Sequence, residues 1–275
     1  MGRGREVGPV LTGDGVDGIT FTGSVLTGES ILASAQPHRA RVQLEMGGKN
    51  PLVVLDDADL EVAVEVALQG AFGSTGQRCT ASSRLIVTAG IHDRFVEALT
   101  AGMRQWRVGD ARASDTDMGP VVDAAQLAQD EKYLDIARTE GGEVVGGERV
   151  ERGSNGHFLA PALVVGTTSG MTVNREEVFG PVASVIKVDD YDQALATAND
   201  TEFGLSSGIV TTSLAAATHF RRHSTAGMVM VNVPTAGVDY HVPFGGRRGS
   251  SYGPREQGTH AREFFTVGKT AYLKA

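Results

Sequence analysis

Cys79 is the only cysteine among 275 residues and lies in the segment GQRCTASS, residues 76–83. A cysteine without a disulfide partner usually behaves as a small core hydrophobe, but the neighbours of this one are small and polar. Gly76 and the small residues after the cysteine let a ligand approach backbone N–H groups, which can stabilise an oxyanion. Arg78 favours the thiolate if its side chain faces the thiol. Cys79 is therefore a candidate nucleophile, and an inert loop thiol is the alternative.

Glu45 is a candidate general base in the segment LEMGGKNP, residues 44–51. It follows an apolar stretch typical of a strand and precedes Gly47 and Gly48. Its carboxylate would therefore lie at a strand end, where α/β folds place their functional sites, and could activate water there. The alternative is a solvated glutamate at a turn.

Two glycine patterns imitate nucleotide-binding motifs without their context. Gly13, Gly15 and Gly18 fit GxGxxG but precede a strand instead of joining a strand to a helix, so we predict a loop. Residues 23–30, GSVLTGES, have the glycine spacing of a P-loop, but Glu29 replaces the phosphate-binding lysine. Triphosphate binding is therefore not expected.

The start of the helix after Gly23 and Ser24 is a different kind of phosphate site. A strand, a turn and a helix would place free N–H groups and the positive end of the helix dipole at these two residues, where a pyrophosphate could bind. A serine at this place also serves simply as a helix N-cap.

His219 and His223 share a helix face, but the Glu of HExxH is absent and Arg221 and Arg222 would repel a cation. We therefore expect a basic helix end and no metal site.

The elements expected around these residues alternate between strand and helix, which predicts an α/β fold. Strands are expected within 18–24, 41–46, 83–90, 158–168, 182–190, 206–212 and 227–234. Helices are expected within 25–36, 58–73, 92–106, 125–141, 191–200 and 214–224, with Asp59 near the start of the second.

The composition of the chain limits the classes of partner that we expect it to bind. The net charge is −8 and the basic residues are scattered, so we expect neither a nucleic acid nor a membrane as partner. One cysteine, no apolar leader and no membrane-length apolar run indicate a cytoplasmic protein.

Four segments together resemble motifs of the aldehyde dehydrogenases. They are LEMGGKNP, FGSTGQRCTASS at 72–83, EEVFGPV at 176–182 and PFGGRRGS at 243–250. Their order fits the family, Cys79 follows Glu45 by the expected 34 residues, and the resemblance covers nearly the whole chain.

The resemblance implies an enzyme that oxidises an aldehyde with NAD or NADP through a cysteine thiohemiacetal and thioester. Cys79 corresponds to the nucleophile, and Glu45 to the base that activates the hydrolytic water. Phe244 corresponds to an aromatic residue of the substrate tunnel. The residues assigned to the cofactor are Gly23, Ser24, Met46, Glu177 and Phe179.

The resemblance also predicts the domains. Residues 1–46 would be a remnant of the Rossmann-like dinucleotide-binding domain, 47–249 the aldehyde dehydrogenase-like catalytic domain and 250–275 a C-terminal tail. In the family, most of the dinucleotide-binding domain precedes the counterpart of Ser24, whereas only 23 residues precede it here. We therefore expect a truncated, weakly active chain. A noncatalytic remnant that only folds or binds another chain is the alternative. Family members form homo-oligomers.

The C-terminal segments PFGGRRGSSYGPREQG and FFTVGKTAYLK look most like the subgroup that oxidises α-ketoglutaric semialdehyde, 2,5-dioxopentanoate. Arg255 in this region is either structural or a carboxylate anchor. Another semialdehyde or a broad range of aldehydes stays open as the substrate. Transfer of the thioester to coenzyme A is less favoured, because enzymes of that kind commonly lack the counterpart of Glu45.

Overall fold

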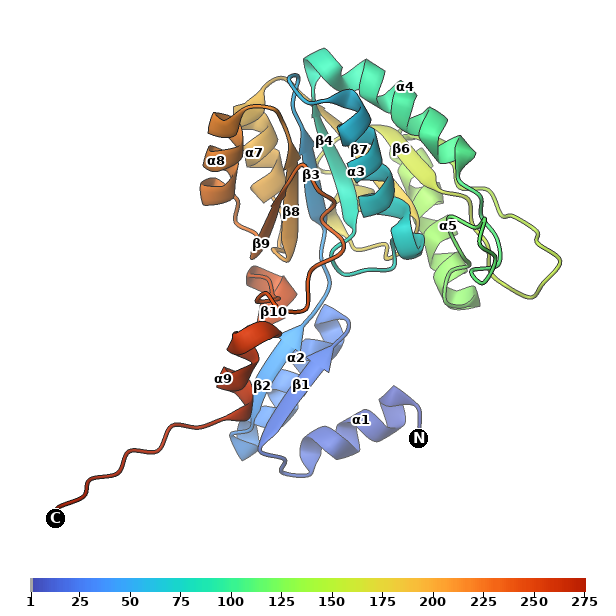
Figure 1. Ribbon diagram of the computed structural model, residues 1–275. Helices are drawn as coiled ribbons and strands as arrows, with labels where there is room; N and C mark the ends of the chain where they lie inside the picture. Colours follow the sequence, from blue (N-terminus) through green and yellow to red (C-terminus); the bar gives the residue numbers. More distant parts are fainter. Residues whose placement is uncertain (1) are drawn as a thin grey trace. The chain divides into compact units, whose positions relative to one another are not determined.

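The structure is a computed structural model that describes residues 2–275 (Figure 1). The chain forms two compact units, one from residues 48–237 and one from the residues up to Gly47 together with Val238–Ala275. The functional domain boundaries expected at 46/47 and 249/250 stay a prediction. Within residues 2–275, every helix is too short or too polar to cross a membrane.

The unit of residues 48–237 contains a seven-stranded sheet in the order β5-β6-β7-β4-β3-β8-β9. Neighbouring strands are parallel except β5, which runs antiparallel to β6. The strands are β3 Asn50–Val54, β4 Ser82–Thr88, β5 Glu143–Gly146, β6 Ala162–Thr167, β7 Val182–Val188, β8 Ser206–Val210 and β9 Met228–Val231. The helices are α3 Leu60–Phe72, α4 Ala89–Gln105, α5 Ala124–Thr139, α6 Thr172–Arg175, α7 Tyr191–Asn199 and α8 Leu214–His223.

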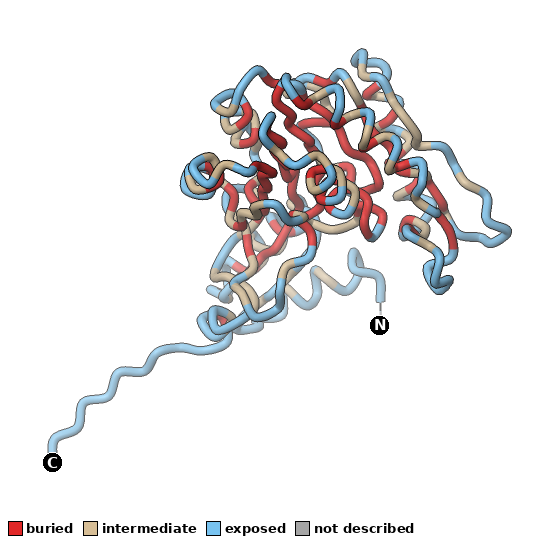
Figure 2. The backbone as a smooth tube through the Cα atoms, turned by 45° about the horizontal axis from the view of Figure 1, so that its top comes forward, coloured by how far each residue is buried: buried red, intermediate tan, exposed pale blue. Residues whose placement is uncertain are grey.

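Helices cover both faces of this sheet, as a parallel sheet requires. Leu52 and Leu85 point toward α3 and α4, whereas Val53 and Ile86, one residue along each strand, point toward α7 and α8. Figure 2 shows that the buried parts of this unit follow its strands. The predicted α/β class is therefore confirmed.

The predicted helices of this unit form close to where local signals placed them. Asp59 caps α3, because its side chain accepts hydrogen bonds from Glu61 N and Val62 N. The inner strand β3, beside the central strand β4, was not predicted. Its five residues are all buried, so they lack the alternation that marks a half-exposed strand.

The second unit holds a smaller sheet in the order β1-β2-β10, in which β1 and β2 are parallel. Its elements are α1 Gly4–Gly13, β1 Gly18–Thr22, α2 Val25–Ala35, β2 Arg41–Glu45, β10 Ser251–Tyr252 and α9 Ala261–Phe265. Helix α2 packs closely on β2, since a Cβ added at Gly28 would lie 2.4 Å from Met46 Sδ. Gly13 ends α1 and Gly18 begins β1, with the expected loop between them.

Candidate active site

A strained turn fixes the loop that carries Cys79. Ser74, Thr75 and Gly76, directly after α3, all have positive φ angles of 53°, 59° and 63°. A Cβ at Gly76 would lie 2.2 Å from the carbonyl oxygen of Gly180, so no larger residue fits without a shift. This close approach fixes residues 73–81, the cysteine loop between α3 and β4, against the segment 176–182.

Buried side chains hold the backbone on the other side of the cysteine, which is itself half-buried. Asn50 Nδ2 donates to the carbonyl oxygens of Cys79 at 2.8 Å and of Ala81 at 2.9 Å. Thr235 Oγ1 donates to the carbonyl oxygen of Thr80 at 2.7 Å. The carbonyls of three successive residues therefore have fixed partners.

The guanidinium of Arg78 donates to Ser74 Oγ at 2.7 Å. Its positive charge thus lies over the preceding turn. The expectation that this charge favours a Cys79 thiolate stays a prediction.

Glu177 lies beside the cysteine loop in the same unit. Its Oε1 accepts a hydrogen bond from Gly48 N at 2.9 Å. Burial raises the pKa of Glu177, and the Gly48 bond and the neighbouring Lys49 partly offset this rise. Lys49 is 1% exposed, and burial lowers its pKa to about 7. The adjacent Glu176 accepts the Tyr133 hydroxyl at 2.6 Å instead.

A narrow cavity lies beside Glu177 and the loop before β4, and Cys79 is not among the residues that line it. Its lining includes Gly48, Arg78, Ser83, Glu177 and Phe179. Phe179 is 37% exposed with a positive φ of 61°, an unusual backbone conformation that is held in place at this cavity. The buried hydroxyl oxygen of Ser83 has no hydrogen-bond partner in the structure, so the cavity contains an unused polar group.

The carboxyl group of Glu45 is the chemical feature of the other unit. Glu45 is 2% exposed, and Ser251 Oγ donates to its Oε2 at 2.6 Å. Burial raises the pKa of Glu45 to about 7, whereas the Ser251 bond and Arg255 act to lower it. A Cβ at Gly245 would lie 2.7 Å from Glu45 Oε1, so this glycine leaves room for the carboxyl.

The other predicted residues of this unit are Gly23 and Ser24, which follow β1, Met46, which follows β2, and Phe244, which precedes β10. Ser24 caps α2 by accepting a hydrogen bond from Thr27 N at 3.3 Å, and Gly23 N donates to the carbonyl oxygen of Glu45 at 3.0 Å. Met46 is buried against α2. Phe244 is half-buried, and its backbone pairs with that of Glu256.

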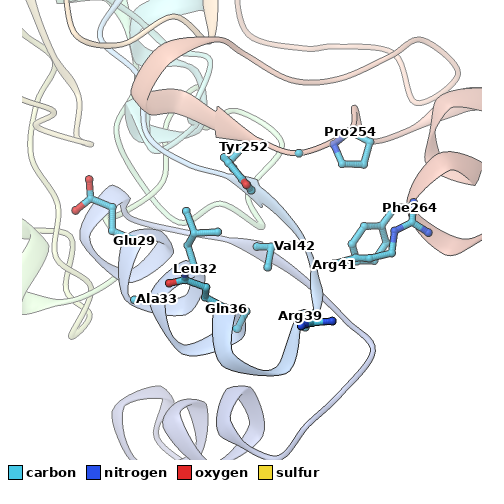
Figure 3. A pocket seen from close by; sticks show the side chains of 13 residues that line it. Glu29, Leu32, Ala33, Gln36, Arg39, Arg41, Val42, Tyr252, Pro254 and Phe264 are labelled. Atoms are coloured by element: carbon cyan, nitrogen blue, oxygen red, sulfur yellow. The ribbon is translucent and has the colours of Figure 1, made fainter.

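This unit also contains a cavity of about 800 Å³ (Figure 3). Side chains from α2 and β2 line it together with Tyr252, Pro254 and Phe264. None of the residues predicted for catalysis or cofactor binding is among those that line it.

The rings of His219 and His223 stack at 3.8 Å on α8. His219 Nδ1 contacts the Tyr191 hydroxyl, and His223 Nδ1 contacts the His219 carbonyl oxygen. Among residues 2–275, no group of three or more His, Cys, Asp and Glu side chains could hold a metal ion.

Sequence reasoning missed Asn50 and Ser251, although each contacts a predicted site residue. Asn50 carried a usable signal. Asparagine is depleted in strands, so Asn50 before the apolar run 51–54 would have indicated a side chain with specific partners, had this run been predicted as a strand. Ser251 carried none, because its partner is 206 positions away.

Comparison with known proteins extends over almost the entire chain. Residues 1–271 match the aldehyde dehydrogenase family. The chain is 45% identical to alpha-ketoglutaric semialdehyde dehydrogenase of Bacillus subtilis over 99% of its length and 57% of the relative. It is 39% identical to 2,5-dioxopentanoate dehydrogenase of Saccharolobus solfataricus, again over 99% and 57%.

The fold matches solved structures equally well. Betaine aldehyde dehydrogenase from Staphylococcus aureus in complex with NAD+ gives a TM-score of 0.92 at 35% identity, covering 96% of this chain and 53% of that one. The chain thus spans about half the length of the relatives it matches. These matches confirm the resemblance inferred from the four motifs, and the chain belongs to the aldehyde dehydrogenase family.

Proposed function

We propose that this chain oxidises an aldehyde to a carboxylic acid with NAD+ or NADP+, with Cys79 as nucleophile and Glu45 as general base. The observation that carries the proposal is the family match over residues 1–271, which includes the only cysteine of the chain on a loop fixed by buried side chains. The same match includes a buried carboxyl at Glu45.

In this mechanism, Cys79 Sγ forms a bond to the aldehyde carbon. The oxygen becomes an oxyanion, which the Cys79 N–H stabilises. A bound nicotinamide dinucleotide supplies the acceptor for the hydride that then leaves this carbon. Glu45 takes a proton from water, the hydroxide attacks the resulting thioester, and the carbon–sulfur bond breaks to restore the thiolate. With a pKa of about 7, Glu45 is a base suited to neutral pH.

Several residues fit a dinucleotide. Glu177 would accept hydrogen bonds from the nicotinamide ribose, with Phe179 beside it, and the Ser83 hydroxyl is an unused polar group in the same cavity. N–H groups in the first turn of a helix lack intrahelical acceptors, so the start of α2 after Gly23 and Ser24 would hold the phosphates. Met46 would complete this contact.

For the substrate we propose a semialdehyde, with α-ketoglutaric semialdehyde as the first compound to test. Two relatives at 45% and 39% identity carry the names of dehydrogenases for this compound. Phe244 would line the tunnel through which the aldehyde reaches Cys79.

Intact-mass analysis after incubation with the aldehyde and NAD+ or NADP+ tests the proposal. Because Glu45→Gln removes the base for hydrolysis, this variant is expected to accumulate an acyl adduct, and Cys79→Ala is expected to form none. The absence of an adduct with either cofactor in every variant would favour the noncatalytic alternative. Parallel assays with betaine aldehyde and lactaldehyde measure the substrate preference.

A further inference from the structure

Asn50 uses its whole side-chain amide at one junction. It is the first residue of β3 and is 2% exposed. Both protons of Nδ2 are directed to the cysteine loop, to the carbonyl oxygens of Cys79 and Ala81 at 2.8 and 2.9 Å. Its Oδ1 accepts a hydrogen bond from Ser206 N at 3.0 Å. The planar amide therefore fixes the cysteine loop relative to β3 and β8.

The positions of these bonds determine the backbone at the nucleophile. The peptide unit after Cys79 and the one after Ala81 are both anchored to a single rigid group. The carbonyl between them, on Thr80, binds Thr235 Oγ1. Rotation about the backbone bonds of residues 79–81 would break at least one of these contacts, so the direction of the Cys79 Cα–Cβ bond, from which the thiol extends, is set.

Gly48 packs closely against the same amide. A Cβ at Gly48 would lie 2.7 Å from Asn50 Oδ1 and 2.8 Å from the Cys79 carbonyl oxygen. A side chain at position 48 would therefore displace either the Asn50 amide or the Cys79 carbonyl.

We infer that Asn50 is a positioning residue for the nucleophile, which holds the Cys79 thiol in place through the two carbonyls on either side of Thr80. This inference rests on the proposed role of Cys79. Asn50 itself touches neither substrate nor cofactor in this scheme.

Cys79 is the only thiol, so its alkylation by iodoacetamide reports on this loop without any need for catalysis. Asn174→Ala is the matched control. Asn174 is 1% exposed in the same unit, and its amide also makes three hydrogen bonds, none of them to the cysteine loop. Once the hydrogen bonds from Asn50 to the Cys79 and Ala81 carbonyls are lost, the half-buried thiol reaches solvent more often. At matched stability we expect Asn50→Ala to be alkylated at least about tenfold faster than Asn174→Ala.

Asn50→Asp keeps the test decisive if the alanine variant does not fold. At about pH 6 the introduced carboxyl is neutral, because burial raises its pKa, and it can still donate one hydrogen bond to the loop. At about pH 9 it is an anion facing two carbonyl oxygens. The alkylation rate relative to the unmodified protein should therefore increase with pH, and that of Asn174→Asp should stay flat.

Equal alkylation of the Asn50 and Asn174 variants at every pH would overturn the inference. This outcome differs from failure of the proposed function. If the unmodified chain forms an acyl adduct but the alkylation rates agree, Cys79 is the nucleophile and Asn50 does not position it. If no adduct forms but the alkylation rates differ, Asn50 positions the Cys79 thiol and the proposed chemistry is wrong.

Discussion

At the residue scale, the charge of Glu45 is set by competing effects. Burial disfavours the carboxylate and raises the pKa to about 7, whereas the Ser251 hydrogen bond favours the charged form. Gly246 N donates to Ser251 Oγ at 2.6 Å, so the hydroxyl proton is directed to Glu45. The Ser251 hydroxyl thus limits the rise, and with a pKa of about 7 the carboxyl is about half ionised at neutral pH.

Removal of that hydroxyl tests this balance. Ser251→Ala deletes a hydrogen bond to a charged group, so we expect the pKa of Glu45 to rise further, by about one to two units. NMR titration with carbon-13-labelled glutamate measures it, and Glu45→Gln assigns the signal. Ser251→Thr retains the hydroxyl and should return the pKa toward its original value. An unchanged pKa in Ser251→Ala would contradict the assigned role.

At the element scale, the turn between α3 and the cysteine loop depends on Gly76. A Cβ there meets two carbonyl oxygens, of Gly180 at 2.2 Å and of Ala71 at 2.8 Å. Neither belongs to a flexible side chain that could move away. The fit of the turn against the segment 176–182 therefore requires glycine.

Gly76→Ala is expected to destabilise the unit of residues 48–237 by at least about 3 kcal/mol. Gly153→Ala is the control, because Gly153 has the same φ of 63° with nothing near its missing Cβ. That change should cost only about 1 kcal/mol, the penalty of the left-handed conformation. The only tryptophan, Trp106, lies in this unit, so its fluorescence in urea reports both values. Equal losses would refute the steric argument.

Most elements could be predicted because their signals are local. The helix expected within 191–200 forms at Tyr191–Asn199, where Asp190 caps it by accepting a hydrogen bond from Gln193 N. Strand β3 escaped prediction because it is buried on both faces, and β5 and α6 are only four residues long. Helix α1 has no buried residue and contains Pro9. Four-residue elements are too short to show a period, and a proline inside a segment argues against a helix.

At the scale of the whole molecule, one buried acid makes stability depend on pH. Asp130 on α5 is fully buried, and its Oδ2 has no hydrogen-bond partner. Burial raises its pKa from 3.8 to about 7, although Gln126 donates to its Oδ1 at 2.8 Å. The folded unit keeps this proton between these two pH values, whereas the unfolded chain releases it, so stability falls as pH rises through that window.

Asp130→Asn removes this titration. We expect the free energy of unfolding of this variant to exceed that of the unmodified chain by an amount that grows with pH, from little at about pH 4 to about 4 kcal/mol at about pH 8. Trp106 fluorescence at several pH values again follows the unit. Asp135→Asn, an exposed change on the same helix, should leave the pH dependence as it was. Parallel curves for Asp130→Asn and the unmodified chain would disprove the assignment.

The sequence by itself determined the chemical groups and the local elements. Cys79, Glu45 and Glu177 stand in motifs of the family, and capping residues and apolar periodicity mark the helices and most strands. Only the tertiary structure decided which groups act on them: Asn50 on the Cys79 carbonyl, Ser251 on the Glu45 carboxyl and Gly180 against Gly76. The physical reason is range. Capping and periodicity act over a few residues, whereas these contacts join positions 29 to 206 residues apart, and they exist only after the chain has folded.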